Sequence, residues 1–330
     1  MASYRRIESD PSNLADWMAL LPESLTSAPL RHLAIPGSHA SFSCTVTHFN
    51  DIAPDSSFLV RTLGHLSCCL GKERIYQWNR TQDLSVKQQL TSGIRYFDVQ
   101  VSARTRNGDF RVVCGLFGDE LSACMKEIKV FLDHHDKEVI IFDINQFYEM
   151  NDVLHMKLLS IITHCFDDKL CPYNKDSDVS LESLWNRGQQ VIVIYHHDII
   201  QEYENFWPGS SVVYHPDSCA ETPEDLIFQL EKNFDNDQER VHFECCRAVV
   251  SLSNRKCLMR LSSSRKQEIS RTVAPVISSW LKDACRTRTK LNIIVVDFIH
   301  LLNFVQHVVN LNTAEGADVY DVHANGKTTL

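Results

Sequence analysis

A histidine near the start of the chain occupies a position suited to acid–base chemistry. The apolar run 33–36 ends in a Pro-Gly turn, and His39 follows that turn with Ala40 as its neighbour. A carboxylate, Asp297, ends the last apolar run of the chain. A buried carboxylate that binds one imidazole nitrogen orients a histidine as a general base. We therefore expect His39 and Asp297 to form the centre of a site if their two segments are neighbours.

Other polar residues end apolar runs in the same way. They are Asp98, Gln100, Cys114, Asp143, Asn145, Tyr195 and His196. In an α/β barrel, catalytic side chains come from the carboxyl ends of several strands, so these residues would meet at one mouth. Structural roles compete with these functional ones. Asp98 is also a candidate partner of Arg95 or of a neighbouring strand, and Cys114 is a candidate inert thiol at a strand end.

Apolar runs that alternate with amphipathic stretches predict an α/β fold. The predicted strands are residues 30–35, 93–101, 109–115, 138–144, 189–195, 211–215, 247–252 and 291–298. Apolar side chains at helical spacing predict helices over 121–135, 153–166 and 222–234. In the last of these, Thr222 is the expected N-cap. About eight strand–helix units are typical of a (β/α)8 barrel, although an open doubly wound sheet produces the same periodicity.

The composition of the chain is that of an ordinary globular protein. Its 330 residues are 44% hydrophobic and 23% charged, and the formal net charge of -9 argues against a nucleic-acid partner. The amino terminus lacks an apolar signal core, which predicts a cytoplasmic protein with reduced cysteines. The doublets Cys68-Cys69 and Cys245-Cys246 lack the spacing of a zinc site, so we expect no metal at the cysteines.

Six segments carry a distinctive combination of motifs in a fixed order. They read "LADWMALLPESL", "LAIPGSHASFS", "GIRYFDVQV", "CGLFGDEL", "EVIIFDINQFY" and "LNIIVVDF". Together they resemble the phosphatidylinositol-specific phospholipase C X-domain-containing proteins, small relatives of the bacterial phosphatidylinositol phospholipases C. The resemblance implies a single distorted (β/α)8 TIM barrel over residues 13–312, with an inserted segment 45–80 at its mouth. Residues 1–12 would be a leader and residues 313–330 a flexible tail.

The resemblance also implies a reaction, the cleavage of an inositol lipid between glycerol and phosphate. The inositol 2-hydroxyl attacks phosphorus while one histidine takes its proton and a second histidine protonates the leaving oxygen. A cation neutralises the phosphate, either an arginine or, in the large eukaryotic enzymes, calcium. On this basis His39 is the first histidine, and Asp98 and Asp297 are the carboxylates. Candidate headgroup contacts are Asn145, Tyr195 and His196.

The chain departs from the family pattern at positions that carry the chemistry. Ala40 stands where the family has an aspartate, Gln100 where it has the arginine, and Cys114 where it has the second histidine. Losing a charged donor costs on the order of 10²–10³ in turnover, and losing a general acid about 10²–10⁴. Calcium requires about six oxygen ligands, and Ala40 and Gln100 remove likely ones, so we expect no metal or other cofactor. These changes predict a phosphoric diester hydrolase relative that is catalytically impaired or inactive.

Three functional hypotheses follow. The first is a pseudoenzyme that binds an inositol lipid or inositol phosphate headgroup, with segment 45–80 in peripheral contact with an anionic membrane. The second is a calcium-independent phosphodiesterase that uses His39 and Asp297 as the base and Cys114 as acid or nucleophile. The third is a non-catalytic interaction protein. The terminal Thr328–Leu330 resembles a PDZ ligand, although three residues carry little information.

Overall fold

The described part of the chain covers most of the expected barrel. The computed structural model describes residues 11–56, 68–105, 108–175, 178–216, 220–233, 241–251, 263–287 and 290–315. Most of the expected leader 1–12 and tail 313–330 lies outside these residues, including Thr328–Leu330. Residues 57–67 of the expected insert 45–80 also lie outside the described residues. Helix α3 (Cys68–Asn79) forms nearly all of the remainder of that insert towards its carboxyl end.

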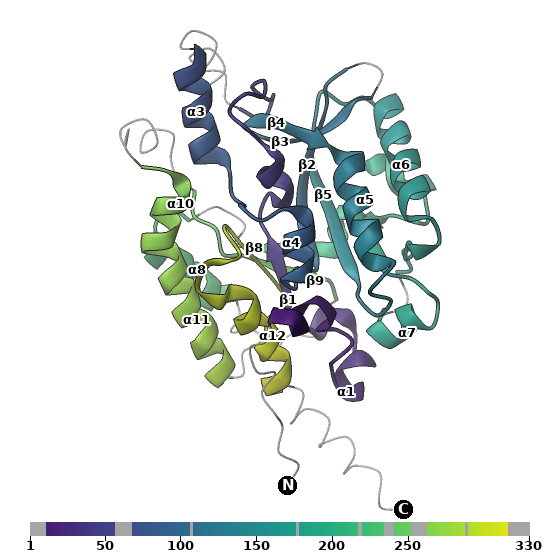
Figure 1. Ribbon diagram of the computed structural model, residues 1–330. Helices are drawn as coiled ribbons and strands as arrows, with labels where there is room; N and C mark the ends of the chain where they lie inside the picture. Colours follow the sequence, from purple (N-terminus) through teal and green to yellow (C-terminus); the bar gives the residue numbers. More distant parts are fainter. Residues whose placement is uncertain are drawn as a thin grey trace, which may run out of the picture.

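A curled, mostly parallel sheet forms the centre of the molecule (Figure 1). Its strands are β1 (Ile35–Ser38), β2 (Tyr96–Ala103), β3 (Phe110–Cys114), β4 (Leu116–Glu120), β5 (Ile140–Tyr148), β6 (Val191–Tyr195), β7 (Trp207–Pro208), β8 (Val212–His215), β9 (Phe243–Arg247) and β10 (Ile293–Val296). The strands follow the order β7-β6-β5-β2-β1-β10-β9-β8, and within the described residues no ladder joins β7 to β8. This curled parallel arrangement confirms the predicted distorted α/β barrel.

Helices cover the outside of the sheet. They are α1 (Glu23–Thr26), α4 (Val86–Thr91), α5 (Leu121–Leu132), α6 (Asp152–Phe166), α7 (Leu181–Trp185), α8 (Pro223–Asn233), α10 (Arg265–Glu268), α11 (Ala274–Thr287) and α12 (Phe304–Glu315), together with α3. Figure 1 places α5 and α6 on one side of the sheet and α8 and α11 on the other. The helices predicted over 121–135, 153–166 and 222–234 are confirmed as α5, α6 and α8. Thr222 caps α8, because its hydroxyl accepts a hydrogen bond from the Asp225 amide at 3.1 Å.

Two predicted strands are displaced along the chain. The strand predicted over 30–35 begins only at Ile35, because side chains rather than a ladder bind the preceding backbone. The Leu33 carbonyl accepts from the Asn292 amide at 2.7 Å, and the Ala34 N–H donates to Asn312 at 2.8 Å. The strand predicted over 247–252 is instead β9, which ends where the prediction began, at Arg247. Its cysteine doublet is fully buried, since a free cysteine packs like a small apolar side chain.

The strand predicted over 109–115 belongs to a hairpin rather than to the barrel. It is β3, which runs antiparallel to β2 and pairs with β4, a strand that the apolar pattern did not predict. Cys114 therefore ends a hairpin strand at the mouth of the barrel. The short strand β7 was not predicted either.

The first and last barrel strands are neighbours, as the barrel prediction requires. β1 pairs in parallel with β10, and Ser38 is the register partner of Val296. His39 and Asp297 follow these two residues, so both leave the sheet at the same edge. No helix in the described ranges is long and apolar enough to span a membrane.

Candidate functional site

Polar side chains from most barrel strands meet at the carboxyl edge of the sheet. Hydrogen bonds and ring contacts link them into two groups, one around Asp297 and one around Asp143. The residues involved are His39, Asp98, Asn145, His196, Tyr96, Tyr214, Arg247, Arg265, Asp143 and Asp297. Because the surrounding interior is apolar, this concentration of charge marks a site.

His39 and Asp297 form the pair that the sequence predicted. The Nδ1 atom of His39 lies 2.7 Å from Oδ1 of Asp297, and the other carboxylate oxygen accepts from Nε of Arg265 at 2.7 Å. Burial by itself would raise the pKa of Asp297, but Arg265 and His39 outweigh it and hold that pKa below its usual value. An ionised Asp297 fixes the proton on Nδ1 and leaves Nε2 of His39 as the proton acceptor.

The turn after β1 determines the direction of His39. Gly37 lies against the neighbouring strands, where an added Cβ would be 2.8 Å from Val295 and 2.9 Å from Tyr96. Ala40 adopts a left-handed conformation with φ of 38°, and its amide donates to Oδ2 of Asp98 at 3.1 Å. The Ala40 methyl group belongs to a small apolar cluster that includes Cys114. The turn thus keeps its link to Asp98 and has no carboxylate of its own.

Asp98 lies between His39 and Asn145. Its Oδ2 is 3.8 Å from Nε2 of His39, and its Oδ1 accepts a hydrogen bond from the side-chain amide of Asn145. Asp98 does not pair with Arg95, because Arg95 binds Glu138 at 2.8 Å in the fully buried interior. The bond with Asn145 instead joins Asp98 to the neighbouring strand β5, which was the other structural alternative. The Oδ1 atom of Asn145 is buried and has no hydrogen-bond partner among the described residues.

Gln100 contributes no charge to the site. It follows an irregularity in the pairing of β2 with β5, and its side chain is partly buried. The backbone of Gln100 pairs with Gln146 of β5. Gln100 therefore places a neutral amide on this part of β2.

Cys114 is enclosed rather than presented to the mouth. Its thiol donates to the backbone carbonyl of Asn79, at the end of α3, over 2.9 Å. Burial is the largest influence on this thiol and raises its pKa well above the ordinary value. A thiol that stays protonated against apolar neighbours is a poor nucleophile and a slow proton donor.

His196 and Tyr195 point in opposite directions from the end of β6. Nε2 of His196 lies 2.8 Å from Asp143, inside the barrel. The hydroxyl of Tyr195 instead lies 2.7 Å from Nδ1 of His155 on α6, and the tyrosine is fully buried. Of the predicted headgroup contacts, the structure brings Asn145 and His196 to the mouth and places Tyr195 on the outer face of the sheet.

The Asp143 group is a second polar cluster beside the first. Asp143 is fully buried and accepts hydrogen bonds from His196 and from the hydroxyls of Tyr96 and Tyr214. The guanidinium of Arg247 lies over the Tyr214 ring, 3.8 Å from its centre. These bonds hold His196 and Tyr214 in fixed orientations at the mouth.

Sequence reasoning missed Tyr96, Tyr214, Arg247 and Arg265. Tyr214 lies near the end of a correctly predicted strand, and its polar tip was the available signal. Arg247 was taken as the start of a strand, whereas it ends β9. Arg265 lies on the short helix α10, and no local pattern links it to Asp297. Among the residues that the structure describes, no cluster of three or more His, Cys, Asp or Glu side chains is arranged to hold a metal ion.

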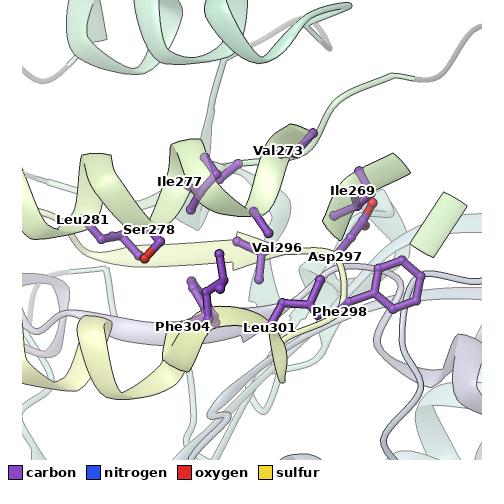
Figure 2. Close-up of a pocket in the computed structure, with 13 residues that line it drawn as sticks. Ile269, Val273, Ile277, Ser278, Leu281, Val296, Asp297, Phe298, Leu301 and Phe304 are labelled. Carbon is purple, nitrogen blue, oxygen red and sulfur yellow. The ribbon is translucent and has the colours of Figure 1, made fainter. Parts of the chain in front are cut away.

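A mostly apolar pocket lies behind Asp297 (Figure 2). Its walls come from the π-helical turn Ile269–Val273, from α11 and from the end of β10 with the segment that follows it. Asp297 is the charged residue in this wall, and Ser278 adds a hydroxyl farther along it. The pocket shares Asp297 with the site and lies between the end of β10 and α11.

Solved structures of bacterial enzymes have the same fold. A phosphatidylinositol-specific phospholipase C from Staphylococcus aureus aligns with a TM-score of 0.63 at 15% identity, over 92% of this chain and 99% of that chain. The phosphatidylinositol-specific phospholipase C from Listeria monocytogenes aligns with a TM-score of 0.61 at 18% identity, over 91% and 98% of the two chains. The fold is therefore that of the bacterial phosphatidylinositol phospholipases C, a distorted TIM barrel.

Curated relatives identify the family. The mouse PI-PLC X domain-containing protein 3 is 33% identical over 90% of this chain and 93% of its own length. The mouse PI-PLC X domain-containing protein 2 is 35% identical over 90% of this chain and 87% of its own length. The human PI-PLC X domain-containing protein 1 is 30% identical over 94% of this chain and 95% of its own length. No family model matches the sequence. The chain belongs to the PI-PLC X domain-containing protein family.

Proposed function

We propose that this chain binds the headgroup of an inositol lipid or an inositol phosphate at the barrel mouth and cleaves phosphodiesters weakly or not at all. The observation that carries the proposal is the state of the site around His39. The base and its carboxylate are in place, with 2.7 Å between Nδ1 and Oδ1, whereas the arginine and second-histidine positions hold Gln100 and Cys114.

The binding part of the proposal rests on polar groups that remain at the mouth. Asn145 has a buried oxygen without a partner among the described residues, and a ligand hydroxyl is the natural donor for it. His196 and Tyr214 are held by Asp143, so they offer a preorganised wall. An inositol ring, which carries a hydroxyl on nearly every carbon, matches such a surface.

The catalytic part rests on the two missing groups. Without a charged donor, turnover falls by about 10²–10³, and without a general acid by about 10²–10⁴. Cys114 does not replace the acid, because burial raises its pKa and its proton is engaged by the Asn79 carbonyl. Turnover is therefore expected roughly 10⁴-fold or more below that of a bacterial enzyme with the full set.

A phosphodiesterase assay on phosphatidylinositol tests this part. The wild-type chain is compared with His39→Ala, with the restored variant Ala40→Asp/Gln100→Arg/Cys114→His, and with a bacterial enzyme assayed alongside. His134→Ala is the matched histidine control, because His134 is an exposed residue at the end of α5. Activity that appears only in the restored variant supports loss of the catalytic groups on an intact scaffold.

Rapid turnover by the wild type that disappears in His39→Ala would instead establish a working phosphodiesterase. Binding is measured separately, by calorimetric titration of myo-inositol 1-phosphate and by co-sedimentation with phosphatidylinositol vesicles. Absence of both binding and turnover would refute the proposal and favour an interaction protein. Cytoplasmic location and peripheral membrane contact are further parts of the proposal, and the vesicle measurement tests the second of them.

A further inference from the structure

Arg247 places a positive charge inside the barrel mouth. The chemistry described above does not use this charge. Arg247 is the last residue of β9, and its register partner on β10 is Val295, two residues before Asp297. The guanidinium lies over the Tyr214 ring, 3.8 Å from its centre. Because Tyr214 is itself bound to Asp143, this contact directs the guanidinium into the barrel.

The surroundings keep Arg247 charged without neutralising it by an ion pair. Burial alone would lower its pKa, but the Asp98 carboxylate, with smaller effects from Cys245, Tyr96 and Tyr214, raises it above the ordinary value. Within the described residues, no carboxylate lies at ion-pair distance from Arg247. A guanidinium stacked on a ring keeps its in-plane N–H groups available, and these donors fit the oxygens of a phosphate.

Two other arginines already have carboxylate partners. Arg265 donates to Asp297 at 2.7 Å, and Arg95 donates to Glu138 at 2.8 Å. Arg247 is attached to β9, which pairs with β10, and β10 in turn pairs with the strand that precedes His39. Its donors and the proton-accepting Nε2 of His39 therefore face the same mouth.

We propose that Arg247 is the phosphate-binding cation of this chain and acts from β9 in place of the arginine that Gln100 replaces on β2. This assignment rests on the proposed binding of an inositol phosphate headgroup. Its ligand is a phosphate ester anion, carried either by a soluble inositol phosphate or by an inositol lipid. In this arrangement the phosphate lies between Arg247 and His39, and the inositol hydroxyls face Asn145.

Calorimetric titration with myo-inositol 1-phosphate, and co-sedimentation with phosphatidylinositol vesicles, measure the effect of changing this residue. Arg247→Gln is expected to weaken binding about 10- to 100-fold, because it removes charge-assisted hydrogen bonds. Arg247→Lys keeps the charge but lacks the planar guanidinium. Its affinity is expected to lie between those of the wild type and Arg247→Gln. The matched control is Arg286→Gln, whose side chain on α11 is 79% exposed and whose affinity should equal that of the wild type.

The exchanged variant Gln100→Arg/Arg247→Gln gives the sharpest result. It moves the cation back to β2 and should recover binding that Arg247→Gln alone has lost. Binding to both probes indicates that a soluble inositol phosphate is a ligand, and binding to vesicles alone indicates an inositol lipid. Either outcome supports the assignment if the binding depends on Arg247.

Two different results overturn the assignment. A wild-type chain that binds neither probe refutes the proposed function and this assignment with it. A wild-type chain that binds, together with an Arg247→Gln chain that binds equally well, refutes the role of Arg247 alone. If the glutamine variant does not fold by circular dichroism, Arg247→Met replaces it, and an unchanged affinity of that variant gives the same refutation.

Discussion

Replacing Asp297 by asparagine should destabilise the fold as well as disturb the site. The Asp297 side chain is 2% exposed and that of Arg265 is 11% exposed, and they are joined at 2.7 Å. Removing one partner of a buried ion pair costs about 3–5 kcal/mol. Asparagine keeps one oxygen as an acceptor, so we expect a loss of about 3 kcal/mol in the free energy of unfolding.

A double-mutant cycle separates this charge effect from general damage. Urea unfolding is followed for Asp297→Asn, Arg265→Gln and the double variant, and the double loss should fall short of the sum by about 2 kcal/mol. The control cycle uses Asp283 and Arg286, which lie 3.1 Å apart but are 60% and 79% exposed. There the coupling should stay below about 0.5 kcal/mol.

The acid dependence provides a second arm of the same experiment. The folded pKa of Asp297 lies below its ordinary value of 3.8, so the folded state binds this proton less readily than the unfolded state. The stabilisation is therefore complete at neutral pH and is lost as the pH falls through the folded pKa. A loss under about 1 kcal/mol at neutral pH, or additive single losses, would refute this account of the pair.

Two further predictions concern the scaffold. Burial, with a smaller contribution from a neighbouring histidine, lowers the pKa of His155 to about 4, so between pH 6.5 and this value the unfolded state binds a proton that the folded state does not. The free energy of unfolding should fall by up to about 3 kcal/mol over this interval, and by less in His155→Gln. Urea unfolding at pH 7 and pH 4.5 measures both values. An equal fall in the wild type and in the variant would contradict this prediction. Gly37→Ala should cost about 1–3 kcal/mol by overpacking. Its Cβ would lie 2.8 Å from Val295, and an unchanged melting temperature would show that the strands yield.

The polar residues that end apolar runs were the strongest guide to the site. His39 and Asp297 were predictable because each follows a buried strand, and neighbouring parallel strands end at the same edge. The prediction succeeded even though β1 begins five residues later than expected, because the end of the strand, rather than its start, positions the histidine.

The same reasoning failed where burial did not follow the apolar pattern. Arg247 was hidden by an apolar run that follows it, "AVV", although the strand is the preceding "FECCR". Tyr195 and His196 are adjacent in sequence, yet alternate residues of a strand face opposite sides, so only His196 enters the barrel.

The sequence by itself determined the alternating pattern of strands and helices, and it placed His39 and Asp297 each directly after an apolar run. These follow from residue types and from a period of two along each strand, both of which are local. Only the tertiary structure decided that Arg265 binds Asp297, that the Cys114 thiol donates to the Asn79 carbonyl, and that Arg247 lies over the Tyr214 ring. Those contacts join residues far apart along the chain or on separate strands, and packing of the complete barrel selects them.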